Sequence, residues 1–170
     1  MELIKLFEDR FSVRKFSDKK VEKEKVDLIL EAGRLAPTAV DFQPQRIFVI
    51  ESEKALADLK NCTIFHFDAP LAILVCYDKN VSWQRKYDSH NMGEVDASIV
   101  ATHMMLEVAN LGLGTTWVGH FDPQAIINTY NLPENLVPVA LFPIGYPADD
   151  VEPSPKHFER KPISETVKYL

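Results

Sequence analysis

The chain has 170 residues and a mass of 19.4 kDa, which fits one domain over 1–170 with room for a sizeable core. Apolar residues make up 46% and charged residues 26%, so disordered, collagen-like and coiled-coil chains are poor interpretations. The formal net charge of −6 argues against nonspecific nucleic-acid binding, which needs a basic face.

Hydrophobic periodicity and turn residues predict helices and strands that alternate along the chain. The predicted helices cover a short segment around 3–7, then 22–36, 52–60, 93–111 and 122–130, and the predicted strands cover 46–51, 71–77, 115–119 and 137–145. Pro138 and Pro143 place the last strand at a sheet edge or make it irregular. The tail from about 147 to 170 is expected to be extended, with a final turn or strand. Alternation around one core predicts a layered α/β sandwich, and the strand order stays open.

Membrane and metal signals are weak in this sequence. The longest apolar stretch, 70–77, is too short to span a membrane, and the start has no signal-peptide pattern. Cys62 and Cys76 form no C-x-x-C motif and are expected to be small buried residues in a reducing compartment. His103 and Glu107 share a predicted helix face, but no third ligand has metal-site spacing. We therefore expect a cytoplasmic protein without a metal site.

The positive charges gather at the two chain ends. Residues 1–25 carry eight basic and six acidic residues and 156–170 carry four and two, so 12 of the 19 basic residues lie there. The chain has six glycines and lacks both G-x-G-x-x-G and G-x-x-x-x-G-K-S/T. Rossmann and P-loop sites need those glycines for close phosphate approach. A bound phosphate would therefore have to be held by side chains, and the two basic ends are the candidates.

Arg10, Ser12 and Arg14 stand at i, i+2 and i+4 in the sequence R-F-S-V-R. In an extended segment these side chains point the same way, and two guanidinium groups with a hydroxyl make an anion clamp. The alternative is a solvated, charged link between two helices. Arg160 and Lys161 either complete the anion site or belong to a basic tail in solvent.

Two other segments carry groups suited to a flat ligand. In A-P-T-A-V-D-F-Q-P at 36–44, prolines stiffen a loop that carries Thr38, Asp41 and Gln43, or the loop only joins a helix to a strand. In L-G-L-G-T-T-W-V-G-H at 111–120, three glycines let the backbone approach a ligand, or the segment is a helix cap and a packed strand. The stretch 83–88 is a candidate lid or a plain surface loop.

In this order, these segments resemble the FMN-dependent nitroreductase family over nearly the whole chain. The match rests on R-F-S-V-R, A-P-T-A-V-D-F-Q-P, D-A-S-I-V-A-T-H-M-M-L, G-L-G-T-T-W-V-G-H-F, P-I-G-Y-P and the terminal R-K-P. The resemblance implies an α+β fold, a three-layer α/β/α sandwich with a mixed, mostly antiparallel central sheet and helices on both faces. It also implies a homodimer with two FMN molecules at its interface, and a tail over 147–170 that packs on the partner subunit.

The resemblance also assigns roles to residues. By resemblance, the FMN phosphate and part of the ring match Arg10, Phe11, Ser12 and Arg14, and a second phosphate contact near the C-terminus matches Arg160 with Lys161. A loop that reaches the flavin from the partner subunit matches Thr38, Asp41 and Gln43. The backbone along the reactive edge of the ring matches Trp117, Val118 and Gly119. No catalytic side chain is implied, because the flavin carries the redox chemistry at N5. NAD(P)H would supply hydride, and an electron-poor acceptor such as a nitroaromatic or a quinone would then enter the same pocket in ping-pong order.

Three residues depart from the family pattern. Gln45 stands where the family often has Trp, and Phe11 where a basic residue is common. Asp41 replaces the usual Asn, and an ionised Asp can only accept hydrogen bonds. Its negative charge would lower the potential of the flavin. The alternative is that the side chain is protonated or turned away. Two other functions stay open: an FMN-binding module without turnover, and a specialised flavoenzyme of this fold, such as a reductive dehalogenase or a flavin-cleaving enzyme.

Overall fold

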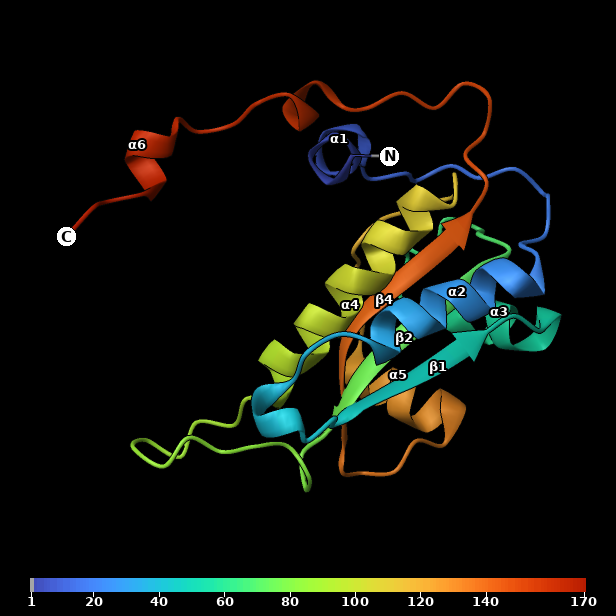
Figure 1. The fold of residues 1–170 in the computed structure, drawn as a ribbon. Coiled ribbons are helices and arrows are strands. Elements are labelled where there is room, and N and C mark those ends of the chain that lie inside the picture. The colour runs from blue at the N-terminus through green and yellow to red at the C-terminus, as the bar shows by residue number, and fades with distance from the viewer. Residues whose placement is uncertain (1) are drawn as a thin grey trace.

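The computed structural model describes residues 2–170 and shows a four-stranded antiparallel sheet with helices on both faces (Figure 1). The helices are α1 (Leu3–Asp9), α2 (Lys23–Arg34), α3 (Glu53–Leu59), α4 (Gly93–Asn110), α5 (Pro123–Tyr130) and α6 (Ile163–Thr166), and the strands are β1 (Gln45–Ile50), β2 (Leu71–Asp78), β3 (Gly114–Thr115) and β4 (Leu136–Gly145). The strand order is β1-β2-β4-β3. The three-layer sandwich predicted from the family resemblance is confirmed.

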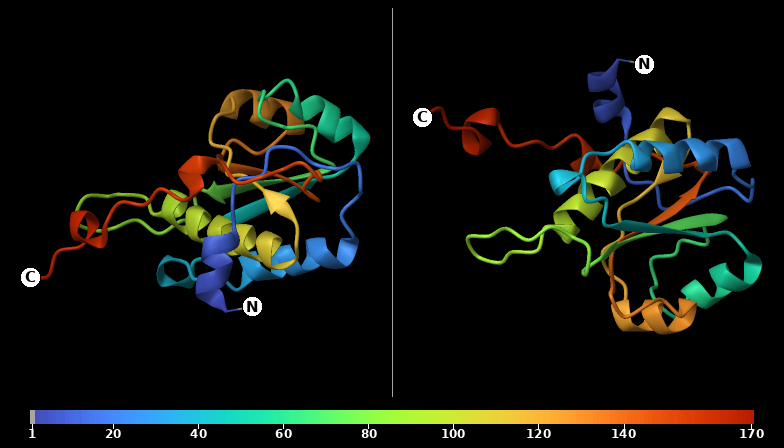
Figure 2. Two further views of the ribbon diagram at one scale, coloured as in Figure 1. Left: turned by 90° about the horizontal axis from the view of Figure 1, so that it is seen from above. Right: turned by 60° about the horizontal axis from the view of Figure 1, so that its bottom comes forward.

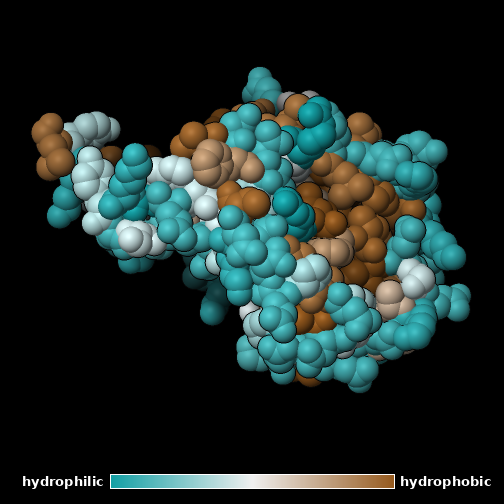
Figure 3. Space-filling model, turned by 90° about the horizontal axis from the view of Figure 1, so that it is seen from below, coloured by the Kyte–Doolittle hydropathy of each residue, from teal (hydrophilic) through white to brown (hydrophobic). Residues whose placement is uncertain are grey.

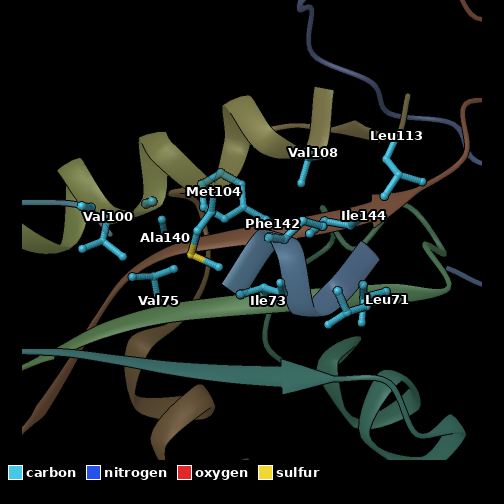
Figure 4. Close-up of a cluster of buried hydrophobic side chains, with 14 of the residues drawn as sticks. Leu71, Ile73, Val75, Val100, Met104, Val108, Leu113, Ala140, Phe142 and Ile144 are labelled. Atoms are coloured by element: carbon cyan, nitrogen blue, oxygen red, sulfur yellow. The ribbon is translucent and has the colours of Figure 1, made fainter. Parts of the chain in front are cut away.

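One face of the sheet is covered by α2 and α4, and this contact forms the larger part of the core (Figure 4). Along α4, the positions 97, 100, 104 and 108 are buried because they recur at the helical spacing that keeps one stripe inside. Gly33 of α2 lets the two helices approach, since a side chain there would lie 2.9 Å from Met104. The two helices thus pack closely near Met104.

The opposite face is covered by α3 and α5 around a second apolar cluster (Figure 2). Both helices begin where the sequence predicts. Ser52 accepts a hydrogen bond from the Ala55 amide at 3.2 Å, and Asp122 accepts from two amides of the first turn of α5. Cys62 and Cys76 are buried free thiols, as expected, and burial raises the pKa of Cys76 to about 12.

The strand β4 corrects one expectation. Its prolines predicted either an edge position or an irregular strand, and the edge position is wrong because β4 pairs with β2 on one side and β3 on the other. The irregularity is present as a register shift opposite Val75 and Cys76. Pro143 turns its carbonyl toward Thr115, whose hydroxyl donates to it at 2.8 Å. Its ring nitrogen therefore also faces the β3 side, where β3 pairs with β4 at residues 144 and 145 and not at Pro143.

The predicted strand over 115–119 is also shorter than expected. It pairs regularly only over Gly114–Thr115, and Val118 forms an isolated bridge with Leu141. Ser12 forms a parallel bridge with Thr115, which makes the otherwise antiparallel sheet mixed.

Past β4 the chain runs beside the N-terminal segment and then leaves the body of the molecule, so that α6 projects from it (Figures 1 and 2). The strand β1 forms an edge of the sheet, since among residues 2–170 it pairs only with β2. Seen from below, the molecule shows a broad apolar area bordered by hydrophilic side chains (Figure 3). Exposed apolar residues include Leu28 of α2, Leu35 directly after α2, and Val49 of β1. No helix described in residues 2–170 is long and apolar enough to cross a membrane.

Candidate functional site

The segment R-F-S-V-R lies directly against the residues that follow α4. The Val13 amide donates to the Thr115 carbonyl at 2.9 Å, and Val13 is buried. Gly114 permits this approach, because a side chain there would lie 2.7 Å from Val13. The backbone alternates at this point, so Ser12 and Arg14 face away from the buried Val13 side chain. The isolated parallel bridge between Ser12 and Thr115 fits the extended geometry on which the predicted anion clamp depends.

Arg14 lines a cavity of about 200 Å³ together with the predicted ring-edge segment. The other lining residues are Phe65, Phe67, Thr116, Trp117, Val118, Gly119 and His120. The Val118 amide and carbonyl both bond to Leu141, which fixes this backbone to the sheet. Gly119 has open space where a side chain would stand. The cavity therefore joins a cation, aromatic surfaces and accessible backbone, which are groups that suit a flat anionic ligand.

Arg10 and Phe11 line a second cavity, of about 180 Å³, at the C-terminal end of α4. Ala109, Gly112 and Pro147 complete its walls on the helix and tail sides. Arg10 and Phe11 thus line one cavity and Arg14 the other, with the bridge from Ser12 to Thr115 between them. One chain thus brings together the predicted anion clamp and the predicted ring-edge backbone.

The ion pairs separate the six arginines of the chain into two groups. Arg34, Arg46 and Arg85 each pair with a carboxylate of the same chain. Among residues 2–170, no carboxylate pairs with Arg10, Arg14 or Arg160, the three arginines that the sequence assigns to an anion. Arg14 is exposed and donates only weakly to the Ser12 carbonyl, at 3.4 Å. Free guanidinium groups at these positions can bind a phosphate without first breaking an ion pair.

The loop after α2 has an unusual backbone. Val40, Asp41 and Gln43 have φ angles of 53°, 56° and 48°, in the left-handed region that favours glycine. Thr38 stabilises the turn, because its hydroxyl accepts from the Gln43 amide at 3.0 Å. The Gln43 side chain donates to Asp41 Oδ1 at 3.0 Å, and Phe42 between them is exposed. This strain is typical of a segment shaped for binding rather than for stability.

Within one chain, this loop lies far from the clamp. It is anchored to the first turn of α4, where Asp96 accepts from the Ala39 amide at 2.8 Å, whereas Arg10 shares a cavity with Ala109 at the other end of the helix. The helix between Asp96 and Ala109 spans about 20 Å. The structure therefore does not bring Thr38, Asp41 and Gln43 to the clamp of the same chain.

The predicted C-terminal contact is likewise separate from the clamp. The tail touches the N-terminal segment at His157, whose ring contacts the Glu8 carbonyl at 2.8 Å. Three residues later Arg160 is exposed and donates only to the adjacent Glu159 carbonyl. Lys161 forms an exposed ion pair with Glu165 at 3.4 Å. Neither side chain contacts Arg10 or Arg14 within the described part of the chain.

Sequence reasoning missed several residues of the site. Phe65 and Phe67 line the cavity beside Trp117 but belong to no motif, and His120 closes the motif over 111–120 without having been assigned a role. Asp96, in the first turn of α4, is not among the predicted site residues. Its signal was its place at the four-residue spacing of the buried stripe 100, 104 and 108, where a charged residue is out of place.

Comparison with known proteins decides the family. The sequence model of the Nitroreductase family matches residues 7–64 and 63–146, which is most of the chain. This chain belongs to the Nitroreductase family. The FMN reductase (NAD(P)H) of Bacillus subtilis strain 168 is 29% identical over 173 residues, covering 91% of this chain and 70% of that protein.

Solved structures of nitroreductases agree with this assignment. A nitroreductase family protein of Clostridium difficile 630 superposes with a TM-score of 0.94 at 40% identity, covering 99% of this chain and 98% of that one. An FMN-dependent nitroreductase of Clostridium difficile R20291 gives 0.77 at 30% identity, covering 89% and 91%. The predicted family, its fold and its enzymatic character are confirmed.

Proposed function

We propose that this nitroreductase binds FMN, takes hydride from NAD(P)H and passes it to electron-poor acceptors such as nitroaromatics or quinones in ping-pong order. The observation that carries the proposal is the bond between Val13 and Thr115, which joins the arginine clamp to the backbone of residues 116–119 in one chain. A nucleotide has a phosphate at one end and a flat ring at the other, so it requires the arginine clamp and the backbone of residues 116–119 to lie side by side. The relatives that are named FMN reductase and FMN-dependent nitroreductase support the same ligand.

The residues present fit such a ligand. Neither Arg10 nor Arg14 forms an ion pair among the described residues, and each guanidinium group can bind a phosphate bidentately. The open space at Gly119 admits a ring edge against the backbone, and any side chain there would fill it. Trp117, Phe65 and Phe67 supply aromatic walls beside that edge.

When bound, the flavin would supply hydride transfer at its N5 atom. The protein would then need no nucleophile or obligate general base, and its residues act by holding and shielding. The clamp residues would hold the phosphate, the backbone at 117–119 would hold the ring edge, and the aromatic walls would lie beside the ring. Because one open cavity must admit both the hydride donor and the acceptor, the two bind in turn, which is the basis for a ping-pong order.

A homodimer would complete the site. The clamp and the loop over 38–43 lie at opposite ends of α4, so a second copy that packs antiparallel along this helix would bring its loop to the clamp. The open edge of β1 and the exposed apolar residues of the tail, among them Val167 and Tyr169, favour a tail that packs on the partner at that edge. Arg160 and Lys161 would reach the phosphate in the same assembly.

The visible spectrum of the purified protein tests the proposal. We expect a yellow protein that bleaches when NADH or NADPH is added without oxygen and regains its colour when a quinone follows. The faster of the two donors identifies the nicotinamide that the enzyme uses. Colourless protein that takes up no added FMN would contradict the proposal, and tight FMN binding without bleaching would favour a module without turnover.

A further inference from the structure

Asp96 is a buried carboxylate in the first turn of α4, with only 1% of its surface exposed. Its Oδ1 accepts from the Ala39 amide at 2.8 Å, while Oδ2 is buried and has no hydrogen-bond partner among the described residues. A buried carboxylate oxygen without a partner costs free energy. An apolar residue would continue the stripe of α4 without this cost. Asp96 therefore serves something other than the packing of the helix.

The helix end that carries Asp96 is a rigid support. Gly93 packs against the ring of Tyr77 on β2, so closely that a side chain there would lie 2.1 Å from the ring. Ala97 and Val100, on the following turn, are fully buried in the core. An acceptor in this position cannot move with a flexible loop. The bond to Ala39 thus transmits a fixed position to the segment that begins there.

The segment held by this bond is the strained one. Val40 follows Ala39 directly, and a β-branched residue rarely adopts a φ of 53°. Asp41 and Gln43 add two more residues in the left-handed region. Each costs free energy relative to an extended backbone and would relax if the loop were released. Asp96 supplies a buried acceptor on a packed helix, so it is suited to hold such a loop through the Ala39 amide.

We propose that Asp96 is a positioning residue, which through the Ala39 amide holds the loop over 38–43 in the shape that presents Asp41 and Gln43 to the flavin of the partner subunit. The inference rests on the proposed function for its ligand, whereas the anchor itself is a property of the protein without flavin. Asp96 touches no reacting group. Its effect is on how well the loop is formed before the ligand arrives, and hence on affinity.

Hydrogen exchange in the flavin-free protein tests the anchor. Asp96→Ala should speed exchange of the amides over 37–43 at least about tenfold, while the amides of β2 keep their protection. Asp96→Asn retains an acceptor and should preserve most of the loop protection. Glu94→Ala removes an exposed acidic residue from the same helix turn and should change nothing. Unchanged loop exchange in Asp96→Ala, or a loop equally loosened by Asp96→Asn, would overturn the anchor.

Flavin binding by the same variants tests the role of the anchor. Asp96→Ala should raise the Kd for FMN at least about tenfold and weaken the quenching of flavin fluorescence, with Asp96→Asn near the parent. Equal FMN affinity in Asp96→Ala and parent would overturn the positioning role even if the loop is looser. If the parent itself binds no FMN, the proposed function fails while the exchange result still decides the anchor. Should Asp96→Ala not fold, Asp96→Val provides a filled position without an acceptor.

Discussion

The Val13 amide donates to the Thr115 carbonyl at 2.9 Å, and this single bond links the N-terminal arginines to the backbone after α4. The two partners are about a hundred residues apart in the sequence. Their contact depends on Gly114, whose missing side chain leaves room for the buried Val13. The glycine-poor chain thus uses this glycine to join two polar segments rather than to surround a phosphate.

Substitution of Gly114 should therefore disturb both stability and ligand binding. In Gly114→Ala the new Cβ would lie 2.7 Å from Val13, a distance at which the segment must shift. Overpacking of this kind costs about 1–3 kcal/mol. We expect a lower urea midpoint for the flavin-free protein and weaker FMN binding, measured by unfolding and by flavin fluorescence.

Gly119→Ala is the matched control, because a side chain there meets open space. Its urea midpoint should equal that of the parent, while FMN affinity falls as the methyl group enters the cavity. A Gly114→Ala protein as stable as the parent would show that the clamp does not depend on this approach.

Asp41 allows a test of the flavin environment that is independent of stability. The carboxylate is exposed on the strained loop and accepts from the Gln43 side chain at 3.0 Å. If it lies beside the ring, its negative charge opposes the anionic reduced flavin. Asp41→Asn should raise the midpoint potential of bound FMN, measured by anaerobic dye equilibration.

Asp27→Asn controls for net charge, since Asp27 pairs with Lys23 on the exposed face of α2. It should leave the potential unchanged. If Asp41→Asn changes neither potential nor FMN affinity, the Asp41 side chain does not contact the flavin.

The helices and most strands could be predicted because their signals are local. The helix α5 begins at Asp122 and Pro123, where an N-cap and a proline at the first helical position act within one turn. The position of β4 could not be predicted in this way. The strand β4 lies in the middle of the sheet because β3 pairs with it at residues 144 and 145, beside Pro143. That pairing depends on the strand order, which the local sequence pattern does not contain.

The site was predicted in parts rather than as a whole. Arg10 and Arg14 follow from spacing and charge, but their distance from Gln43 depends on the length and packing of α4, which the motifs do not contain. The left-handed backbone at Val40 could not be predicted, because no glycine stands at that position to indicate it. Asp96 interrupts the apolar stripe of α4, which is a local signal. Its partner, the Ala39 amide, is distant in the sequence and could not be predicted from that signal.

The environment of Glu22 indicates how the free energy of unfolding changes at acid pH. The Tyr146 hydroxyl donates to its carboxylate at 2.6 Å and Lys19 lies 3.2 Å away, and these groups lower the pKa of Glu22 from 4.5 to about 2. A pKa lowered in the folded state means that the contribution to stability is present above about pH 4.5. It is lost as the pH falls from about 4.5 toward 2, because protonation then favours the unfolded chain.

We expect Glu22→Gln to lower the urea midpoint at neutral pH and to flatten its decline between these two pH values. Tyr146→Phe, which removes the main cause of the shift, should act in the same direction. Glu24→Gln removes an exposed charge from the same helix turn and should keep the parental acid profile. Parallel acid profiles for Glu22→Gln and the parent would exclude this ion-pair and hydrogen-bond network as a source of acid sensitivity.

Mixed dimers test the proposal that two subunits share each site. Arg14→Ala damages the clamp, and the double variant Asp41→Ala/Gln43→Ala damages the loop, so each homodimer should retain little FMN. If each site combines the clamp of one chain with the loop of the other, a dimer of one variant of each kind contains one intact site and one doubly damaged site. Coexpression with two affinity tags and purification over both should yield about one FMN per mixed dimer.

A mixed dimer of Arg10→Ala and Arg14→Ala chains provides the control, because both changes fall in the clamp and every site then lacks one arginine. Its FMN content should stay as low as that of the homodimers. If the clamp and loop of one chain served the same flavin, the first mixed dimer would contain two damaged sites and recover nothing. Recovery in that dimer together with none in the control therefore assigns the loop over 38–43 to the flavin of the opposite subunit, about 20 Å of helix away from its own clamp.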